Sequence, residues 1–443
     1  MCLCSFLWGF SVNYKFFYKL FWFVFFTFIP GIALAQKSNA INQANTAWML
    51  ISTALVLSMT PVGLGLFYGG MVRSKNILNT IGMSLISLAI VSIIWIFIGY
   101  TLAFGPDTYG IIGNLKYLLL NNISLSSVTN TIPTYLYCAF ELSFAAVTLA
   151  LISGSVVERI KFSSWIIFGS LWVIFVYAPI AHWVWGGGFL QKLGVLDFAG
   201  GLVVEANSGI SGLVLALSVG KRRDFKKTII PPSSIALTLI GAGLLWVGWF
   251  GFNAGSAIGS NALSSYVFLS TNTAAAAGAL SWMFIEWILH KHPTMLGAAS
   301  GAIAGLVAIT PACGFVDIGS SLIIGAIAGI ISFLGVTVLK YKFSYDDSLD
   351  VFGVHGLNGI FGIVATGLLA TTLIGPKNGF FFGNHKTLLI QLLALLVTIA
   401  YAAFSTFVIA KFTSLLTNGL RISEEDEQKG LDIATHTETG FDI

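Results

Sequence analysis

Eleven long apolar runs, separated by short polar loops, constrain the fold of this chain more than any other feature of its sequence. A helix of about 20 apolar residues is long enough to cross the hydrocarbon core of a bilayer. Only 9% of the residues are charged, whereas a soluble domain has roughly 25%. We therefore predict an all-α polytopic membrane protein with 11 transmembrane helices. The eighth run is short and rich in glycine and alanine, so we expect it to be buried or broken. The expected spans are 46–70, 77–104, 133–157, 163–185, 199–219, 233–253, 270–290, 296–311, 319–340, 351–373 and 387–414.

The segment 1–35 is typical of a signal peptide. Lys15 and Lys19 precede an apolar run that ends in the small-x-small pattern ALA (33–35), and a polar segment follows. This order of a basic region, an apolar region and a small-residue cleavage site is the signature of secretory targeting. The alternative is an uncleaved first helix, although the apolar run is short for a membrane span.

Lysines and arginines are distributed unevenly between the two sides of the predicted bundle. Most of them follow the odd-numbered spans, above all in the loop KRRDFKK (221–227). Because cytoplasmic loops carry the excess of positive charge, we expect the N-terminus outside and the C-terminus in the cytoplasm, across the plasma (inner) membrane. The net charge of +4 does not indicate a nucleic-acid partner, since the positive residues lie in short loops between apolar runs.

Two ionisable residues lie within apolar runs at matching positions. Glu205 lies in LVVEANSGISGLVLAL and His355 in VFGVHGLNGIFGIVATGLL. At four, five, seven and nine positions further on, the two stretches carry the same residue types: Gly209 and Gly359, Ile210 and Ile360, Gly212 and Gly362, Val214 and Val364. An ionisable side chain at membrane depth marks a functional site by default, and binding sites of transporters often lie at the interface of internal repeats. We therefore expect Glu205 and His355 to share one site.

This match predicts a duplicated architecture. The first repeat comprises five helices at 44–220, and the second comprises five helices at 228–374. Since five is odd, the second repeat enters the membrane from the opposite side, and the two repeats are inverted. An eleventh helix at 386–415 and a cytoplasmic tail at 416–443 follow. The tail is polar and acidic, which is typical either of a regulatory or docking segment or of a disordered solvated end.

Several stretches of the sequence resemble the ammonium transporter family (Amt/Mep/Rh), in particular its bacterial Amt branch. The similarity covers about 44–435 and implies a homotrimer with one pore through each protomer, as well as ammonium, ammonia and the analogue methylammonium as substrates. The stretches are FYGGMVRSKN (67–76), HWVWGGGFL (182–190), DFAGG (197–201), GWFGFNAGSA (248–257), GAIAGLVAITPACG (301–314) and DVFGVHG (350–356).

The resemblance implies an outer recruitment site for ammonium formed by Trp185, Phe144 and Ser256, with Phe140 beside them. A small cation over aromatic faces gains about 0.5–2 kcal/mol, and a serine hydroxyl can accept one N–H. The family also implies that Phe144 and Phe252 stack as a gate beneath this site. The alternative is that these aromatic residues form an interfacial belt at the helix ends.

Further positions are assigned structural roles. The resemblance implies that Asp197, at the start of the fifth helix, orders the vestibule backbone, and Trp249 belongs to the same vestibule. Asp350 opens the tenth helix, and we expect it to cap that helix as an aspartate commonly does. Glu141 and Glu286 also lie within apolar runs, where each either touches the transport path or pairs with a neighbour.

In the pore, most family members carry histidine at both positions of the pair, but this chain carries Glu205 in place of the first. The two groups should titrate as a coupled pair, and one shared proton makes a relay. The resemblance thus implies that ammonium is deprotonated outside, that ammonia crosses an apolar pore, and that the proton passes along Glu205 and His355.

Other functions are kept as alternatives. The chain could be an ammonium sensor that signals through its tail or through a PII-type partner at the cytoplasmic face, or a channel for small neutral solutes. An enzyme is not predicted, because HExxH, GxSxG and P-loop motifs are missing. Cys138 and Cys313 show no metal-site spacing, so we predict neither metal nor cofactor.

Overall fold

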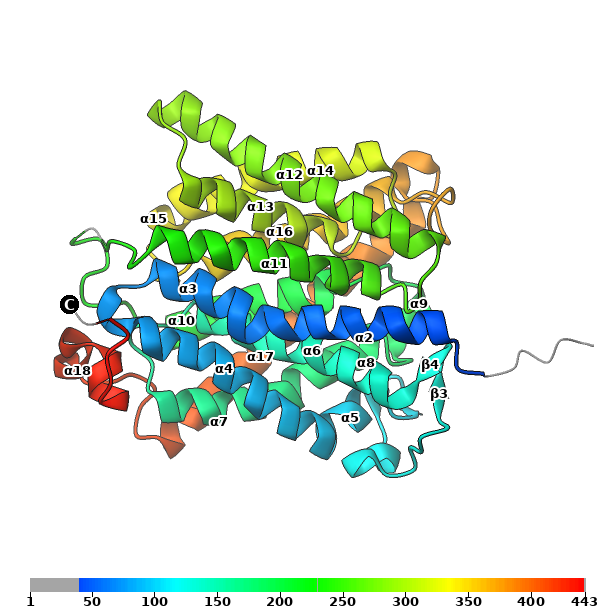
Figure 1. Cartoon of the computed structure of the whole chain (residues 1–443), viewed down its shortest axis with the longest axis horizontal. Coiled ribbons are helices and arrows are strands. Elements are labelled where there is room, and N and C mark those ends of the chain that lie inside the picture. Colours follow the sequence, from blue (N-terminus) through cyan, green and yellow to red (C-terminus); the bar gives the residue numbers. More distant parts are fainter. Residues whose placement is uncertain (1–39, 229, 442–443) are drawn as a thin grey trace, which may run out of the picture. The chain divides into compact units, whose positions relative to one another are not determined.

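The computed structural model describes residues 40–228 and 230–441, so the predicted signal peptide at 1–35 lies outside the described residues. Long helices run roughly side by side through the described part of the chain (Figure 1). Its strands are the two short hairpins β1 (Asp107–Thr108) with β2 (Ile112–Gly113), and β3 (Val128–Thr129) with β4 (Ile132–Pro133). Both hairpins belong to the loop between α5 and α6.

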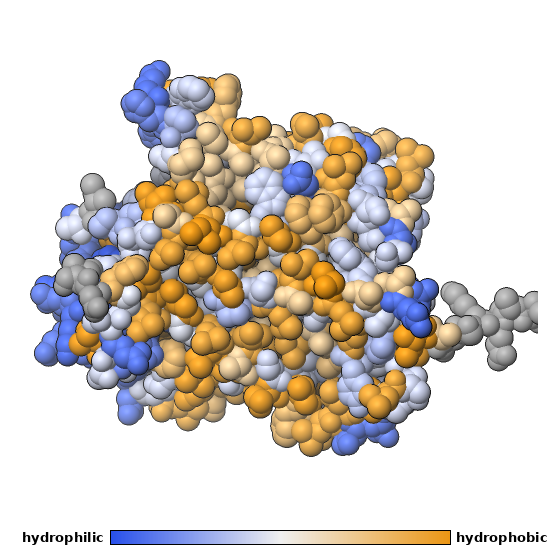
Figure 2. Space-filling model, in the orientation of Figure 1, coloured by the Kyte–Doolittle hydropathy of each residue, from blue (hydrophilic) through white to orange (hydrophobic). Residues whose placement is uncertain are grey.

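The helices follow the predicted apolar runs closely. Among the described residues, nine helical segments are long and apolar enough to cross a membrane, and a shorter apolar helix is α13. The helices are α2 (Gln43–Ser58), α3 (Gly65–Met71), α4 (Ile77–Ile94), α5 (Tyr100–Phe104), α6 (Thr134–Ser153), α7 (Phe162–Trp172), α8 (Ala178–Val184), α9 (Phe189–Leu193), α10 (Asn207–Val219), α11 (Ile235–Gly255), α12 (Ala262–His290), α13 (Met295–Ile309), α14 (Ile318–Leu334), α15 (Lys340–Phe343), α16 (Leu357–Leu369), α17 (His385–Leu416) and α18 (Glu424–Lys429). Apolar side chains cover much of the middle of the face in Figure 2, and hydrophilic ones gather toward the end that carries α18.

Two predicted runs are instructive when compared with the helices, one because it agrees and one because it differs. The eighth run corresponds to α13, most of whose residues are buried, as its small residues indicated. The predicted start of the seventh run, at 270, is wrong, because α12 begins at Ala262 with a capping box formed by Asn261 and Ser264. Hydropathy misses these first two turns because serines there lower the apolar signal, although the capping residues mark the start of the helix.

The segments that contain α10 and α16 cross in direct backbone contact, each helix against the turn that precedes the other. Each follows a π-helical turn, Gly201–Ala206 before α10 and Phe352–Gly356 before α16, and these turns carry Glu205 and His355. A Cβ added to Gly209 would lie 2.2 Å from the Cα of Gly356, and one added to Gly359 would lie 2.5 Å from the nitrogen of Ala206. Small residues of this kind allow membrane helices to approach closely. The crossing therefore brings the two ionisable side chains together.

We expect Gly209→Ala to destabilise the protein, because the new methyl group would collide with the backbone of Gly356. Overpacking of this kind costs about 1–3 kcal/mol or more. The matched control is Gly82→Ala in α4, where an added Cβ has no neighbour within 4 Å, and there alanine's better helix propensity should be neutral or stabilising. The midpoints of thermal unfolding in detergent measure both variants. Equal midpoints for the two would contradict the close crossing.

The tail packs against the end of the bundle at which α4 begins. Lys75 Nζ donates to the carbonyl oxygen of Gln428 at 2.6 Å. The Asp432 carboxylate accepts hydrogen bonds from the backbone N–H groups of Leu78 and Asn79 at 3.0 and 2.8 Å. The alternative of a disordered end is therefore wrong for the residues up to 441.

Candidate functional site

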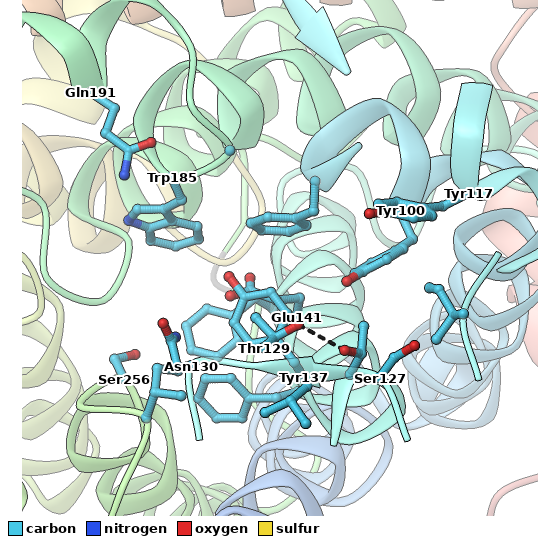
Figure 3. A pocket seen from close by; sticks show the side chains of 18 of the residues that line it. Tyr100, Tyr117, Ser127, Thr129, Asn130, Tyr137, Glu141, Trp185, Gln191 and Ser256 are labelled. Atoms are coloured by element: carbon cyan, nitrogen blue, oxygen red, sulfur yellow. Dashed lines mark hydrogen bonds between the residues drawn. The ribbon is translucent and has the colours of Figure 1, made fainter. Parts of the chain in front are cut away.

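A cavity of about 680 Å³ (Figure 3) is lined in part by β3, which lies at the end of the bundle opposite α18 in Figure 1. Phe140 and Phe144 reach it from α6, Trp185 from the end of α8 and Ser256 from the end of α11. These are the four residues predicted for ammonium recruitment, and all of them line this one cavity. We call it the vestibule.

The aromatic rings of the vestibule are held in fixed positions. The rings of Phe144 and Trp185 meet edge to face with centroids 5.9 Å apart, and Phe140 contacts Phe144 at 4.9 Å. Trp185 Nε1 donates to the carbonyl oxygen of Asp197 at 2.9 Å, which fixes the indole. Ser256 Oγ donates its proton to the carbonyl oxygen of Phe252 at 2.8 Å. The serine oxygen can then serve only as an acceptor toward the vestibule.

The two gate residues stack on each other beneath this site. The rings of Phe144 and Phe252 are 4.1 Å apart at an angle of 25°, and both side chains are buried. Phe144 lines the vestibule, whereas Phe252 lines a second, inner cavity. The stacked rings therefore lie between the two cavities.

The inner cavity offers only about 10 Å³, and Glu205 and His355 lie in its wall. The Glu205 Oε2 and His355 Nδ1 atoms are 2.8 Å apart, and both side chains are buried. Glu205 Oε1 has no hydrogen-bond partner among the described residues. A cavity of this size holds about one water-sized molecule. Its other lining residues are Met59, Leu64, Phe67, Val147, Leu151, Val204, Leu245, Trp249, Phe252 and Ile303.

The Asp197 carboxylate is held by hydrogen bonds to backbone N–H groups. It accepts hydrogen bonds from the N–H groups of Gly200, Gly201 and Leu202 at 2.6–2.9 Å. These are free donors at the start of a helix, so Asp197 orders the turn that leads to Glu205. It is not among the residues that line either cavity.

Two structural assignments need correction. Asp350 does not cap its helix, because Phe352 N–H donates instead to Asp347 Oδ2 at 2.7 Å. Asp350 accepts from Lys340 Nζ at 2.7 Å, and its φ of +62° turns the chain just before the helix. Trp249 lines the inner cavity rather than the vestibule, and its Nε1 donates to Thr310 Oγ1 at 2.8 Å.

The vestibule also contains residues that sequence reasoning did not assign to it. Tyr100 and Tyr117 come from α5 and the loop that follows it, and Tyr137 lies one turn before Glu141 on α6. The one available signal was the spacing of Tyr137, Glu141 and Phe144 at helical intervals, which places them on one face. The loop residues gave no such signal.

Comparison with known proteins decides the family. The family model of the Ammonium Transporter Family matches residues 47–441. The chain belongs to this family. An ammonium transporter of Aquifex aeolicus is 50% identical to this Ammonium Transporter Family member over 95% of this chain and 98% of its own length. Membership of a transporter family agrees with the expectation that the chain is not an enzyme.

Solved structures of Amt and Mep proteins share the fold of this member of the Ammonium Transporter Family. The crystal structure of Saccharomyces cerevisiae Mep2 is 36% identical and matches with a TM-score of 0.81, covering 87% of this chain and 88% of that chain. A protein named Sensor Amt Protein is 27% identical and also matches with a TM-score of 0.81, over 88% of this chain and 98% of its own.

Proposed function

We propose that this protein transports ammonium across a membrane, recruiting the cation in the vestibule and conducting ammonia through the inner cavity. The observation that carries the proposal is the hydrogen-bonded pair Glu205 and His355, buried directly beneath a stacked aromatic gate. Its membership of the Ammonium Transporter Family supports the same substrate. Homologues described as ammonium transporters cover nearly its whole length.

The geometry favours separation of the proton from ammonia. A charged group at the centre of a bilayer is costly, and the inner cavity is too small for an ion with its hydration shell. In our proposal ammonium binds against Trp185, Phe144 and Ser256 and gives up a proton at the gate. The Glu205–His355 pair beneath the gate accepts this proton and returns it to ammonia on the far side of the inner cavity. Neutral ammonia then passes the stacked rings and crosses the inner cavity.

The proton follows through the Glu205–His355 pair. Glu205 Oε2 and His355 Nδ1 lie at hydrogen-bond distance, which allows one proton to move between them. The free Glu205 Oε1 offers a second position at which to receive or release it. Glu205 here stands where the family resemblance leads us to expect histidine, so the pair can carry one negative charge more than a pair of imidazoles.

The same proposal gives the membrane architecture. We take α12 and α13 as two further spans, which makes eleven with the nine apolar segments. α12 has 29 residues, so it is long enough to cross a bilayer. The reciprocal contact of Gly209 with Gly356 and of Gly359 with Ala206 supports two inverted repeats. The excess of positive charge in the loops on the side of the tail supports a cytoplasmic tail.

The proposed assembly is a homotrimer in the plasma (inner) membrane, with a pore in each protomer and a PII-type regulator at the cytoplasmic face. Exposed apolar side chains on the outer helices require either lipid or another protomer as a partner. The basic loop at 221–227 and the docked tail supply charged cytoplasmic surfaces on which a regulator could bind.

A second candidate function is ammonium sensing. The docking of the tail onto α4, at Leu78 and Asn79, supports it, as does the likeness to the protein named Sensor Amt Protein. Transport and sensing would use the same binding residues. A transport-dead variant that still alters the cell's response to ammonium would favour sensing.

We expect purified protein in proteoliposomes to give a saturating current on ammonium pulses and none above background on potassium pulses. The two cations have similar size and charge, so only deprotonation separates them. Electrophysiology on a solid-supported membrane measures both, with empty liposomes as the control. Equal currents for the two cations would indicate a cation channel instead. Ammonia uptake without current would indicate a channel for neutral solutes.

A further inference from the structure

Glu141 is an acid in the vestibule that the proposed recruitment site does not use. It lies on α6, its residue is 6% exposed, and it lines the vestibule. Its Oε2 atom has no hydrogen-bond partner among the described residues. An unpaired buried acceptor is costly unless something binds it. One oxygen of this carboxyl group therefore lacks a hydrogen-bond partner in the wall of the vestibule.

The part of the vestibule around Glu141 is built from aromatic rings. The rings of Tyr100 and Tyr117 are 6.2 Å apart, and those of Tyr100 and Phe104 are 5.8 Å apart. Tyr137 meets Phe104 edge to face at 5.4 Å. Such a group of rings offers negative faces to a cation, and the tyrosines add hydroxyl acceptors.

No positively charged side chain in the described part of the chain lines the vestibule beside Glu141. Among the described residues that line the vestibule, none is lysine, arginine or histidine, and Glu141 supplies the one carboxyl group. In Figure 3, Trp185 and Ser256 lie on one side of the cavity and Tyr100 and Tyr117 on the other. Glu141 lies between these two groups, on the same face of α6 as Phe144.

We propose that Glu141, with the rings of Tyr100, Phe104, Tyr117 and Tyr137, forms a second cation site in the vestibule. Its ligand is a small monovalent cation of the ammonium type, including methylated ammonium, for which an aromatic cage with one carboxylate is the fitting chemistry. The site holds a cation next to the recruitment site and raises its local concentration there. That the natural ligand is ammonium rests on the proposed function, whereas cation binding itself does not.

Crystals soaked in caesium chloride test the binding directly, because caesium is a monovalent cation that scatters anomalously. In the wild type we expect one anomalous peak beside the Glu141 carboxylate and one near Trp185. Glu141→Gln keeps the shape and removes the charge, so it should lose the first peak and keep the second. Trp185→Leu should do the reverse. A wild type without a peak at Glu141, or a peak that persists in Glu141→Gln, would overturn the proposal.

Transport gives an independent measurement. Glu141→Gln should raise the half-saturating concentration of methylammonium about three- to tenfold, because it removes a poorly screened charge from the cavity. It should lower the maximal rate by much less. If Glu141→Gln folds poorly, Tyr137→Phe replaces it and should raise the half-saturating concentration in the same direction. An unchanged value in the variant that folds refutes the site, whereas absence of transport in the wild type refutes the proposed function and leaves the caesium result standing.

Discussion

Replacing Glu205 with leucine should reduce the ammonium-evoked current in proteoliposomes by about tenfold or more, because proton transfer by a positioned group contributes about 10²–10⁴ to a rate. The variant removes the carboxylate that lies 2.8 Å from His355 Nδ1 and interrupts the relay. Glu205→His is the variant to compare with Glu205→Leu, since it keeps an ionisable group at this position. It should recover current with a different dependence on pH.

The control for the Glu205 experiment is Glu286→Gln on α12. Glu286 is also an acid within an apolar run, but it accepts hydrogen bonds from Trp282 Nε1 and Thr294 N–H at 3.0 and 2.8 Å and lines neither cavity. Its replacement should leave the current at the wild-type level. If Glu205→Leu matched that level and still excluded potassium, the relay would have to be abandoned.

The helices and the central pair were predictable because both depend on local patterns. Apolar runs give transmembrane helices directly, since a bilayer leaves a backbone few other ways to satisfy its hydrogen bonds. The matching glycines placed Glu205 and His355 in one register, and their contact at 2.8 Å follows from the close crossing those glycines permit. The resemblance implied that Asp197 orders the backbone at the start of a helix, and its carboxylate accepts hydrogen bonds from N–H groups there.

Contacts between distant segments were not predictable. The segment DDSLD (346–350) contains three aspartates, and only the turn geometry shows that Asp347, not Asp350, reaches the first free N–H. Lys75 and Gln428 meet although they are 353 positions apart. The loop after α5 likewise brings the ring of Tyr117 next to that of Tyr100. This contact was not predictable, because an irregular loop has no periodic sequence pattern.

The end of the bundle that carries the tail is held by a buried ionic cluster whose centre is Glu158. Its carboxylate accepts from Arg73 at 2.9 Å and from Arg222 at 2.8 Å, and Asn76 Nδ2 donates to it at 2.9 Å. Glu158 is fully buried. Burial alone would raise the pKa of this carboxyl, but the two guanidinium groups outweigh it and lower the pKa to about 2.

We expect Glu158→Gln to lower the free energy of unfolding by about 3 kcal/mol, because it leaves buried positive charge without its partner. The matched control is Asp224→Asn, which breaks one ion pair of Arg73 at a carboxylate that is 39% exposed. Such pairs are worth less than about 1 kcal/mol. Unfolding in detergent, followed by tryptophan fluorescence, compares the two variants, and equal losses would show that burial of the cluster contributes nothing.

The pH dependence of the Glu158→Gln effect follows from the same ion pairs. A carboxyl whose folded pKa lies below its unfolded value of about 4.3 stabilises the protein above that pH and loses its contribution as the pH falls. With a folded pKa of about 2, the advantage of the wild type over Glu158→Gln should be complete at pH 7. It should then shrink between roughly pH 4.3 and pH 2. A difference that stayed constant over this range would mean that the ion pairs of Glu158 with Arg73 and Arg222 do not carry the stability assigned to them.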